Sequence, residues 1–137
     1  MTWEREGLVL SDEPVDQDAE AIYALLTNTY WAKERTKDEV KKIISHSLCF
    51  SLKDRGELIA FVRIISDYTK MSWVSDMIVR EEYRGRQLGY WMMQNVMNHP
   101  ELKGTQFALQ TKDAHSFYEK LGFAQRSTLM STSATYL

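Results

Sequence analysis

Cysteine, proline and glycine are scarce in this 137-residue chain, which has one, two and six of them respectively. The single cysteine, Cys49, excludes an intramolecular disulfide and a zinc site built from several cysteines. The few prolines and glycines exclude collagen-like and low-complexity chains. No apolar run approaches the roughly 18 residues of a membrane-spanning helix, and the charged N-terminus, Thr2–Glu6, does not resemble a secretory signal. We therefore expect a soluble, cytoplasmic protein without a membrane partner.

The chain also lacks a strong excess of charge of either sign. Lysine and arginine number 17 and aspartate and glutamate 19, which gives a formal net charge of −2. Nucleic-acid-binding domains are usually basic, so nucleic acid is not an expected partner. The histidines, His46, His99 and His115, have no metal-binding spacing, and we predict no metal site. The length is typical of one domain, residues 1–137, in which residues 131–137 could form a tail.

Hydrophobic periodicity, turn residues and helix caps predict the order β-α-α-β-β-β-α-β-α-β. Strands are expected at residues 7–10, 48–53, 58–65, 72–79 and 106–110, with a last strand within 124–137. Helices are expected after a cap at Asp16 or Asp18, after the capping box Thr36–Glu39, at residues 88–98, and after a cap at Asp113. Strand runs flanked by helices predict an α/β fold with a mixed sheet covered on both faces.

The segment Arg84-Gly85-Arg86-Gln87-Leu88-Gly89 follows a buried strand and opens a helix. The first turn of a helix has free backbone N–H groups and a partial positive charge, and glycines allow a phosphate to approach the backbone. Arg80, Arg84 and Arg86 add positive charge at the same place, which indicates a polyanionic ligand. The spacing matches neither the P-loop nor the dinucleotide motif. A tight turn with solvated arginines is the structural alternative.

Together with Asp113-Ala114-His115-Ser116-Phe117-Tyr118-Glu119-Lys120-Leu121-Gly122-Phe123, this segment resembles two motifs of the GCN5-related N-acetyltransferase (GNAT) superfamily. The family's first motif reads Gln/Arg-x-x-Gly-x-Gly/Ala, in which Arg84 and Gly89 match and Gln87 replaces the middle glycine. Its second motif ends in Phe-Tyr-x-Lys-x-Gly-Phe, which residues 117–123 match. The resemblance covers residues 5 to 130 and implies a mostly antiparallel central sheet flanked by helices.

The resemblance implies acetyl-CoA as cosubstrate, with its pyrophosphate on the backbone amides of residues 84–89 and its pantetheine arm along the strand edge at residues 77–79. Asp113 stands near the position of a family asparagine. Gln87 in a left-handed conformation would cost about 1 kcal/mol, and we expect weaker cofactor binding or a shifted loop. The residues expected to bind acetyl-CoA are Met77, Ile78, Val79, Arg84, Gly85, Arg86, Gln87, Leu88, Gly89, Tyr90, Asp113, Phe117 and Tyr118.

Two residues are candidates for catalysis. Tyr118 matches the family's general-acid tyrosine, which protonates or hydrogen-bonds the departing thiolate; a buried packing tyrosine is the alternative. Asp76 is the lone carboxylate in an apolar strand, and burial is expected to raise its pKa and make it a better general base. Asp76 could instead be a structural carboxylate bonded to the backbone or to an arginine. Many family members have a glutamate at the position of Ser75, so a water relay could also supply the base.

By resemblance, the loop between the first two helices lines the acceptor site, with Tyr30, Trp31, Glu34 and Arg35 beside Asp76. We expect acetyl transfer to a primary amine by direct attack in a ternary complex. A small-molecule acceptor is favoured over a protein lysine or N-terminus. Lys33 and Arg35 would suit an acceptor with a carboxylate, whereas the acidic residues would suit a cationic amine. The alternative function is a non-catalytic CoA-binding sensor or interaction module. Few residues follow Phe123, so a homodimer in which the second subunit completes the acceptor site is a further hypothesis.

Overall fold

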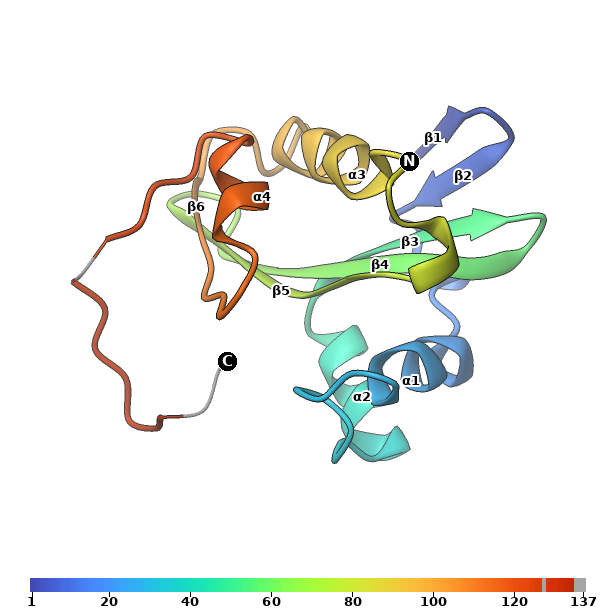
Figure 1. Cartoon of the computed structure of the whole chain (residues 1–137), viewed down its shortest axis with the longest axis horizontal. Coiled ribbons are helices and arrows are strands. Elements are labelled where there is room, and N and C mark those ends of the chain that lie inside the picture. Colours follow the sequence, from blue (N-terminus) through green and yellow to red (C-terminus); the bar gives the residue numbers. More distant parts are fainter. Residues whose placement is uncertain (127, 135–137) are drawn as a thin grey trace.

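The computed structural model describes residues 1–126 and 128–134 and contains a six-stranded sheet in the order β1-β2-β3-β4-β5-β6 (Figure 1). All neighbouring strands are antiparallel except β5 and β6, which are parallel. The strands are β1 (Thr2–Arg5), β2 (Leu8–Ser11), β3 (Leu48–Asp54), β4 (Glu57–Ser66), β5 (Met71–Val79) and β6 (Gln106–Ala108). The helices are α1 (Ala19–Thr27), α2 (Lys37–Ser45), α3 (Leu88–Met97) and α4 (His115–Glu119), with 3₁₀ turns η1 (Pro14–Asp16) and η2 (Glu81–Tyr83).

Helices cover both faces of the sheet, as expected from the sequence. Helices α1 and α2 lie on one face and α3 on the other, with α4 beside β6 (Figure 1). Each face has its own apolar cluster: Met92 and Val96 of α3 pack on one side, and Leu26 of α1 and Val40 of α2 on the other. Because β3 and β4 are covered on both faces, their side chains are buried with little alternation.

Two predicted caps are found at the starts of α1 and α2. The Asp18 carboxylate accepts hydrogen bonds from the N–H groups of Glu20 and Ala21 at the start of α1. Thr36 and Glu39 form the predicted capping box at the start of α2, in which each side chain accepts from the other residue's backbone N–H. The capping box therefore fixes Thr36, the last residue of the loop that joins α1 to α2 (residues 28–36).

The two ends of the chain depart from the prediction. An additional strand, β1, pairs with β2 through a turn in which Glu6 and Gly7 have positive φ. This polar strand was missed because Trp3 alone joins the core, beside Phe50 at a ring distance of 5.9 Å. The strand expected within 124–137 is absent from the described residues 124–126 and 128–134; positions 127 and 135–137 lie outside the described part. Asp113 does not cap α4, since Ala114 holds the N-cap position without a side-chain hydrogen bond.

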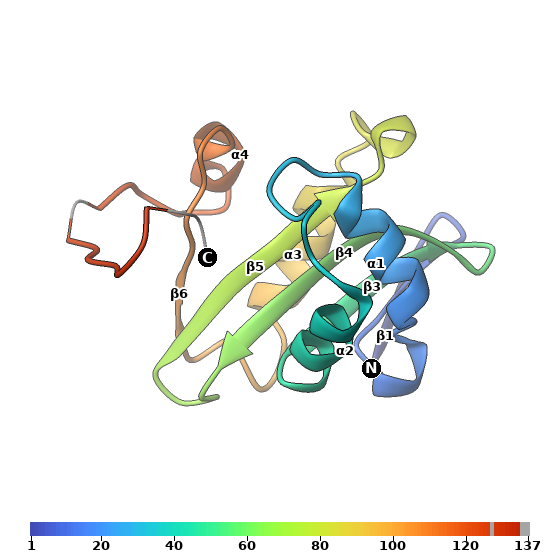
Figure 2. The same cartoon turned by 90° about the horizontal axis from the view of Figure 1, so that it is seen from below.

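Parallel pairing between β5 and β6 is short. The register joins Met71 to Gln106, Ser72 to Phe107 and Trp73 to Ala108, and β6 then ends while β5 continues to Val79. Figure 2 shows β6 diverging from β5 beyond this point. The sheet therefore opens between these two strands.

Replacing the capping threonine should destabilise the protein. Thr36→Ala removes the acceptor for the Glu39 N–H, and we expect the free energy of unfolding to fall by about 1 kcal/mol. Urea unfolding followed by circular dichroism measures this change. Lys41→Gln, an exposed substitution on the same helix, is the control and should stay within about 0.5 kcal/mol of the unsubstituted protein. Equal stability of the two variants would contradict the role of the cap.

Candidate active site

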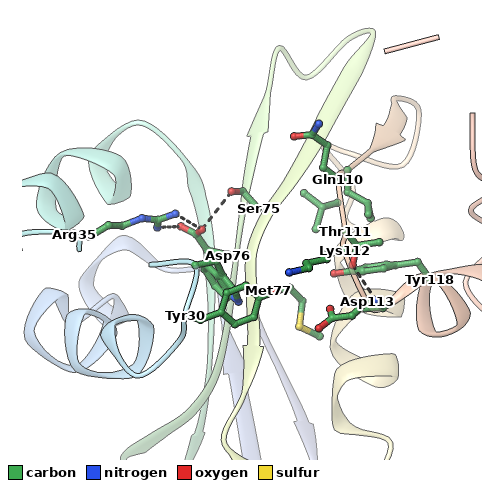
Figure 3. Close-up of a pocket in the computed structure, with 14 residues that line it drawn as sticks. Tyr30, Arg35, Ser75, Asp76, Met77, Gln110, Thr111, Lys112, Asp113 and Tyr118 are labelled. Atoms are coloured by element: carbon green, nitrogen blue, oxygen red, sulfur yellow. Dashed lines mark hydrogen bonds and ion pairs between the residues drawn. The ribbon is translucent and has the colours of Figure 1, made fainter. Parts of the chain in front are cut away.

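A pocket of about 160 Å³ lies in the opening between β5 and the segment that follows β6 (Figure 3). One wall is the edge of β5, the second is the chain from Leu109 to Ala114, and the third is the loop after α1. Tyr118 of α4 also reaches this space. The lining residues are Tyr30, Trp31, Arg35, Val74, Ser75, Asp76, Met77, Leu109, Gln110, Thr111, Lys112, Asp113, Ala114 and Tyr118.

A β-bulge in β5 turns Asp76 toward the α1–α2 loop. The register pairs Phe61 with Ile78 and Arg63 with Ser75, so that two residues of β5, Asp76 and Met77, lie opposite one residue of β4. Asp76 has φ of +55°, a left-handed conformation that aspartate tolerates better than most residues. The bulge shifts the alternation of β5.

The buried Asp76 carboxylate is bound by two guanidinium groups. Arg35 binds it with both terminal nitrogens, at 2.5 and 2.8 Å, and the Nε of Arg63 donates to Oδ2 at 2.6 Å. Arg63 also donates to the Ser47 hydroxyl at 3.1 Å, and Ser75 lies 3.4 Å from Oδ1. Every oxygen of the carboxylate thus has a donor.

The expectation of a raised pKa at Asp76 is wrong. Burial does act to raise the pKa, but the hydrogen bonds and positive charges of Arg35 and Arg63 together outweigh it and hold the pKa below its usual value. The carboxylate is ionised and both of its oxygens accept hydrogen bonds from arginines, which makes it a poor general base. Asp76 is instead the arginine-bound structural carboxylate that was the sequence-based alternative.

Tyr118 is buried and contacts aromatic rings on both sides. Its ring packs edge-on against Phe117 at 4.9 Å and against Phe123 at 5.6 Å between centroids. Burial raises the pKa of its phenol to about 12. The side chain is therefore protonated at every physiological pH and can act as a hydrogen-bond donor in the pocket.

The N-terminus of α3 has the features expected of a pyrophosphate site. Gln87 occupies the N-cap with φ of +62°, as anticipated for a position that glycine usually holds, and its side chain does not cap the helix. A Cβ at Gly89 would lie 2.9 Å from the Met77 side chain and 3.4 Å from the Phe117 ring, so helix and strand approach closely there. The Nε of Arg84 donates a hydrogen bond to the Val79 carbonyl at 3.0 Å, and the guanidinium of Arg86 lies over the Tyr83 ring. The uncapped helix end and the two arginines fit an anionic cosubstrate.

The pocket brings together most of the residues expected to act on the acceptor or in the reaction, which are Tyr30, Trp31, Arg35, Asp76 and Tyr118. Two of the residues expected to bind acetyl-CoA, Met77 and Asp113, line the same pocket. Glu34 is exposed and does not line the pocket, and the side chain of Ile78 packs in the α1–α2 cluster instead. Leu88 is buried in the α3 cluster, so that only its backbone could contact a ligand.

Sequence reasoning missed Arg63 and Lys112. Arg63 is the only charged residue within β4 after Glu57, and Asp76 is the only charged residue in β5. Two lone opposite charges in neighbouring apolar strands predict a buried ion pair, so a signal for Arg63 was available. Lys112 lies in a loop without a distinctive pattern, and no sequence signal marked it.

Comparison with known proteins identifies the family. The Acetyltransferase (GNAT) family profile matches residues 17–123. The chain belongs to the GNAT acetyltransferase family. A GNAT-family candidate acetyltransferase from Xanthomonas campestris pv. campestris is 34% identical, with 96% of each chain covered and a TM-score of 0.89. A candidate acetyltransferase of Gibberella zeae is 25% identical over 88% of this chain and 81% of its own length.

The fold of this GNAT protein is also found in more distant structures. A Deinococcus radiodurans protein with 20% identity, covered over 98% of this chain and 94% of its own, has a TM-score of 0.74. Within the described part of this chain, no helix is long and apolar enough to cross a membrane, and no three acidic, histidine or cysteine side chains cluster as metal ligands.

Removing the shared carboxylate should strongly destabilise this GNAT protein. Asp76→Asn leaves the buried guanidinium of Arg63 and the partly buried one of Arg35 without a counter-charge, and we expect the free energy of unfolding at pH 7 to fall by about 3 kcal/mol. The pKa of Asp76 is lower in the folded protein than in the unfolded chain, where it lies near ~3.9. The carboxylate therefore stabilises the folded state fully above the unfolded pKa, and this stabilisation is lost as the pH falls through the pKa of the folded state. The difference between variant and unsubstituted protein should therefore shrink in acid.

Urea unfolding at pH 7 and at pH 3 measures both expectations. Asp38→Asn, at an exposed position in the first turn of α2, is the matched control and should have little effect at either pH. If Asp76→Asn lowered the free energy of unfolding at pH 7 by less than about 1 kcal/mol, the range of an exposed ion pair, this result would contradict a buried ion network at Asp76.

Proposed function

We propose that this protein transfers the acetyl group of acetyl-CoA to a primary amine by direct attack in a ternary complex. The observation that carries this proposal is the position of Tyr118, whose protonated phenol faces the opened edge of β5 across one pocket. Membership of the GNAT family supports acetyl transfer in general, and the pocket supports the finer assignment.

The residues suited to hold acetyl-CoA extend from α3 to the pocket. The backbone N–H groups at the start of α3, with Arg84 and Arg86, would bind the pyrophosphate, and the free edge of β5 at Met77–Val79 would pair with the pantetheine arm. When bound, acetyl-CoA supplies a thioester carbonyl as the electrophile and a thiolate as the leaving group. The pocket beside Val74–Met77 of β5 would hold this thioester near Tyr118.

Tyr118 stabilises the departing sulfur mainly as a hydrogen-bond donor. A thiol has a pKa near ~8.5, whereas the phenol has a pKa of about 12. Complete proton transfer to the thiolate would thus be uphill by roughly 5 kcal/mol. A hydrogen bond to the developing negative charge has no such cost, and the thiolate then takes its proton from solvent. The amine nitrogen forms the new bond to the acetyl carbon as the carbon–sulfur bond breaks.

The proton of the attacking amine goes to water in this scheme. Among the described residues that line the pocket, the carboxylates are Asp76 and Asp113, and Asp76 is occupied by its arginines. At pH 7 an amine with a pKa near ~10.4 is neutral in about one molecule in 2,500, a handicap of about 4.6 kcal/mol. A pKa near ~8 reduces this handicap to about 1.4 kcal/mol. We therefore expect weakly basic amines to react faster.

Acetyl-CoA should stabilise the protein against heat. A ligand at 100 times its dissociation constant adds about 2.7 kcal/mol to the free energy of unfolding, which corresponds to several degrees in Tm. Differential scanning fluorimetry with acetyl-CoA, CoA and S-acetylpantetheine measures the shift. The last compound lacks the pyrophosphate and should produce a smaller shift. No shift with acetyl-CoA would contradict the proposed cosubstrate.

Removing the phenolic hydroxyl should separate catalysis from binding. Tyr118→Phe keeps the ring contacts, so we expect an unchanged Kd for CoA and a kcat lowered about 100-fold. CoA release from acetyl-CoA, followed with a thiol reagent and an amine, measures kcat. Tyr23→Phe on α1, outside the pocket, is the control and should retain full activity. An unchanged kcat in Tyr118→Phe would overturn the role of the phenol. If the unsubstituted protein bound CoA but showed no turnover, the sensor alternative would be favoured.

A further inference from the structure

We infer that the acceptor amine also carries an anionic group, a carboxylate or a phosphate, which binds between Arg35 and Lys112. This inference rests on the proposed acetyl transfer and names the chemical class of its acceptor. It starts from the charges that surround the pocket.

The buried ion cluster at the pocket wall has an uncompensated positive charge. Arg35 and Arg63 share one carboxylate, that of Asp76. Asp76 is almost fully buried, with 1% of its side chain exposed, whereas the side chain of Arg35 is 22% exposed and faces the pocket. The excess charge of the cluster is therefore presented to the pocket by Arg35. Lys112 adds a second cation and Asp113 a second carboxylate to the lining, and both of these residues are exposed, so that the net excess of positive charge comes from the two arginines that share Asp76.

Both cations have hydrogen-bond donors to spare. Arg35 binds Asp76 with one N–H of each terminal nitrogen, which leaves its other donors available. The Lys112 ammonium makes no hydrogen bond or ion pair with the described residues. Figure 3 shows its amino group pointing into the space between β5 and the segment after β6. A ligand oxygen could therefore accept hydrogen bonds from either side chain.

Aromatic rings of one loop hold these two cations in place. The Arg35 guanidinium lies 5.8 Å from the centroid of the Trp31 ring, and the Lys112 ammonium lies 5.7 Å from that of Tyr30. Such contacts orient a cation without neutralising its charge. The loop of residues 28–36 thus supplies one cation directly and stacks against the other, so that both converge on the pocket.

This charge pattern selects among amines. A carboxylate or phosphate on the acceptor would gain charge-assisted hydrogen bonds from both side chains. A diamine, or a lysine within a basic peptide, would instead bring a further positive charge into a site that already has an excess. We therefore expect an anionic amine to be preferred over an otherwise similar neutral amine by roughly tenfold or more in kcat/KM, which corresponds to about 1.4 kcal/mol.

The test compares acceptors that differ mainly in charge. β-Alanine and 2-aminoethyl phosphate carry an anion, β-alaninamide is the neutral match, and 1,3-diaminopropane is the cationic one. Acetyl-CoA turnover with each gives kcat/KM, and calorimetry gives the binding of each to the protein–CoA complex. The amide has the less basic amine, so the comparison is biased against the expected result. The two anions distinguish a carboxylate site from a phosphate site.

Two variants assign the preference to the pocket. Lys112→Gln should lower kcat/KM for β-alanine about tenfold more than it lowers kcat/KM for β-alaninamide. Arg35→Lys keeps the charge but loses the two-nitrogen contact with Asp76, and it should weaken the preference less. Lys41→Gln on α2 is the control and should retain the full preference. Equal or better binding and turnover of the neutral or cationic amine would overturn this inference while leaving the acetyltransferase proposal intact. If acetyl-CoA did not raise the Tm of the unsubstituted protein, that result would instead contradict the proposed function itself.

Discussion

The carboxylate of Asp76 joins three parts of the molecule that are distant in the sequence. It lies on β5, takes a hydrogen bond from Arg63 on β4, and is bound on its other side by Arg35 of the α1–α2 loop. A buried carboxylate without these partners would be strongly destabilising. The position of the loop, and with it one wall of the pocket, therefore depends on this ion cluster.

The opening in the sheet has a local cause on each strand. On β6, regular pairing stops at Ala108, and the chain leaves the sheet toward α4. On β5, the bulge at Asp76 and Met77 reverses the alternation, so that Val74 packs under α3 whereas Ile78 packs under α1 and α2. A single left-handed residue thus determines which side chains of the strand face the pocket and which face each helical layer.

Several features were predictable because they depend on neighbours in the chain. The caps at Asp18 and Thr36 are set within a few residues and are found as predicted, whereas the cap expected at Asp113 does not form. Gln87 has the left-handed conformation considered for it. The pKa of Asp76 was predicted in the wrong direction because burial alone was considered. Its arginine partners lie 13 and 41 positions away, and no local pattern reports such contacts. The β1 hairpin was missed for a similar reason, since its stability comes from contacts with β2 and Phe50.

The element order and the helix caps follow from hydrophobic periodicity and cap residues, which act over short stretches of chain. The resemblance of residues 84–89 and 113–123 to two GNAT motifs pointed to the family, and it singled out Tyr118 as a candidate catalytic residue. The charge state of Asp76 and the convergence of Arg35 and Lys112 on one pocket depend instead on contacts made in the folded protein. Electrostatic energies depend on distances in space and on burial, and chain folding alone sets both of these quantities.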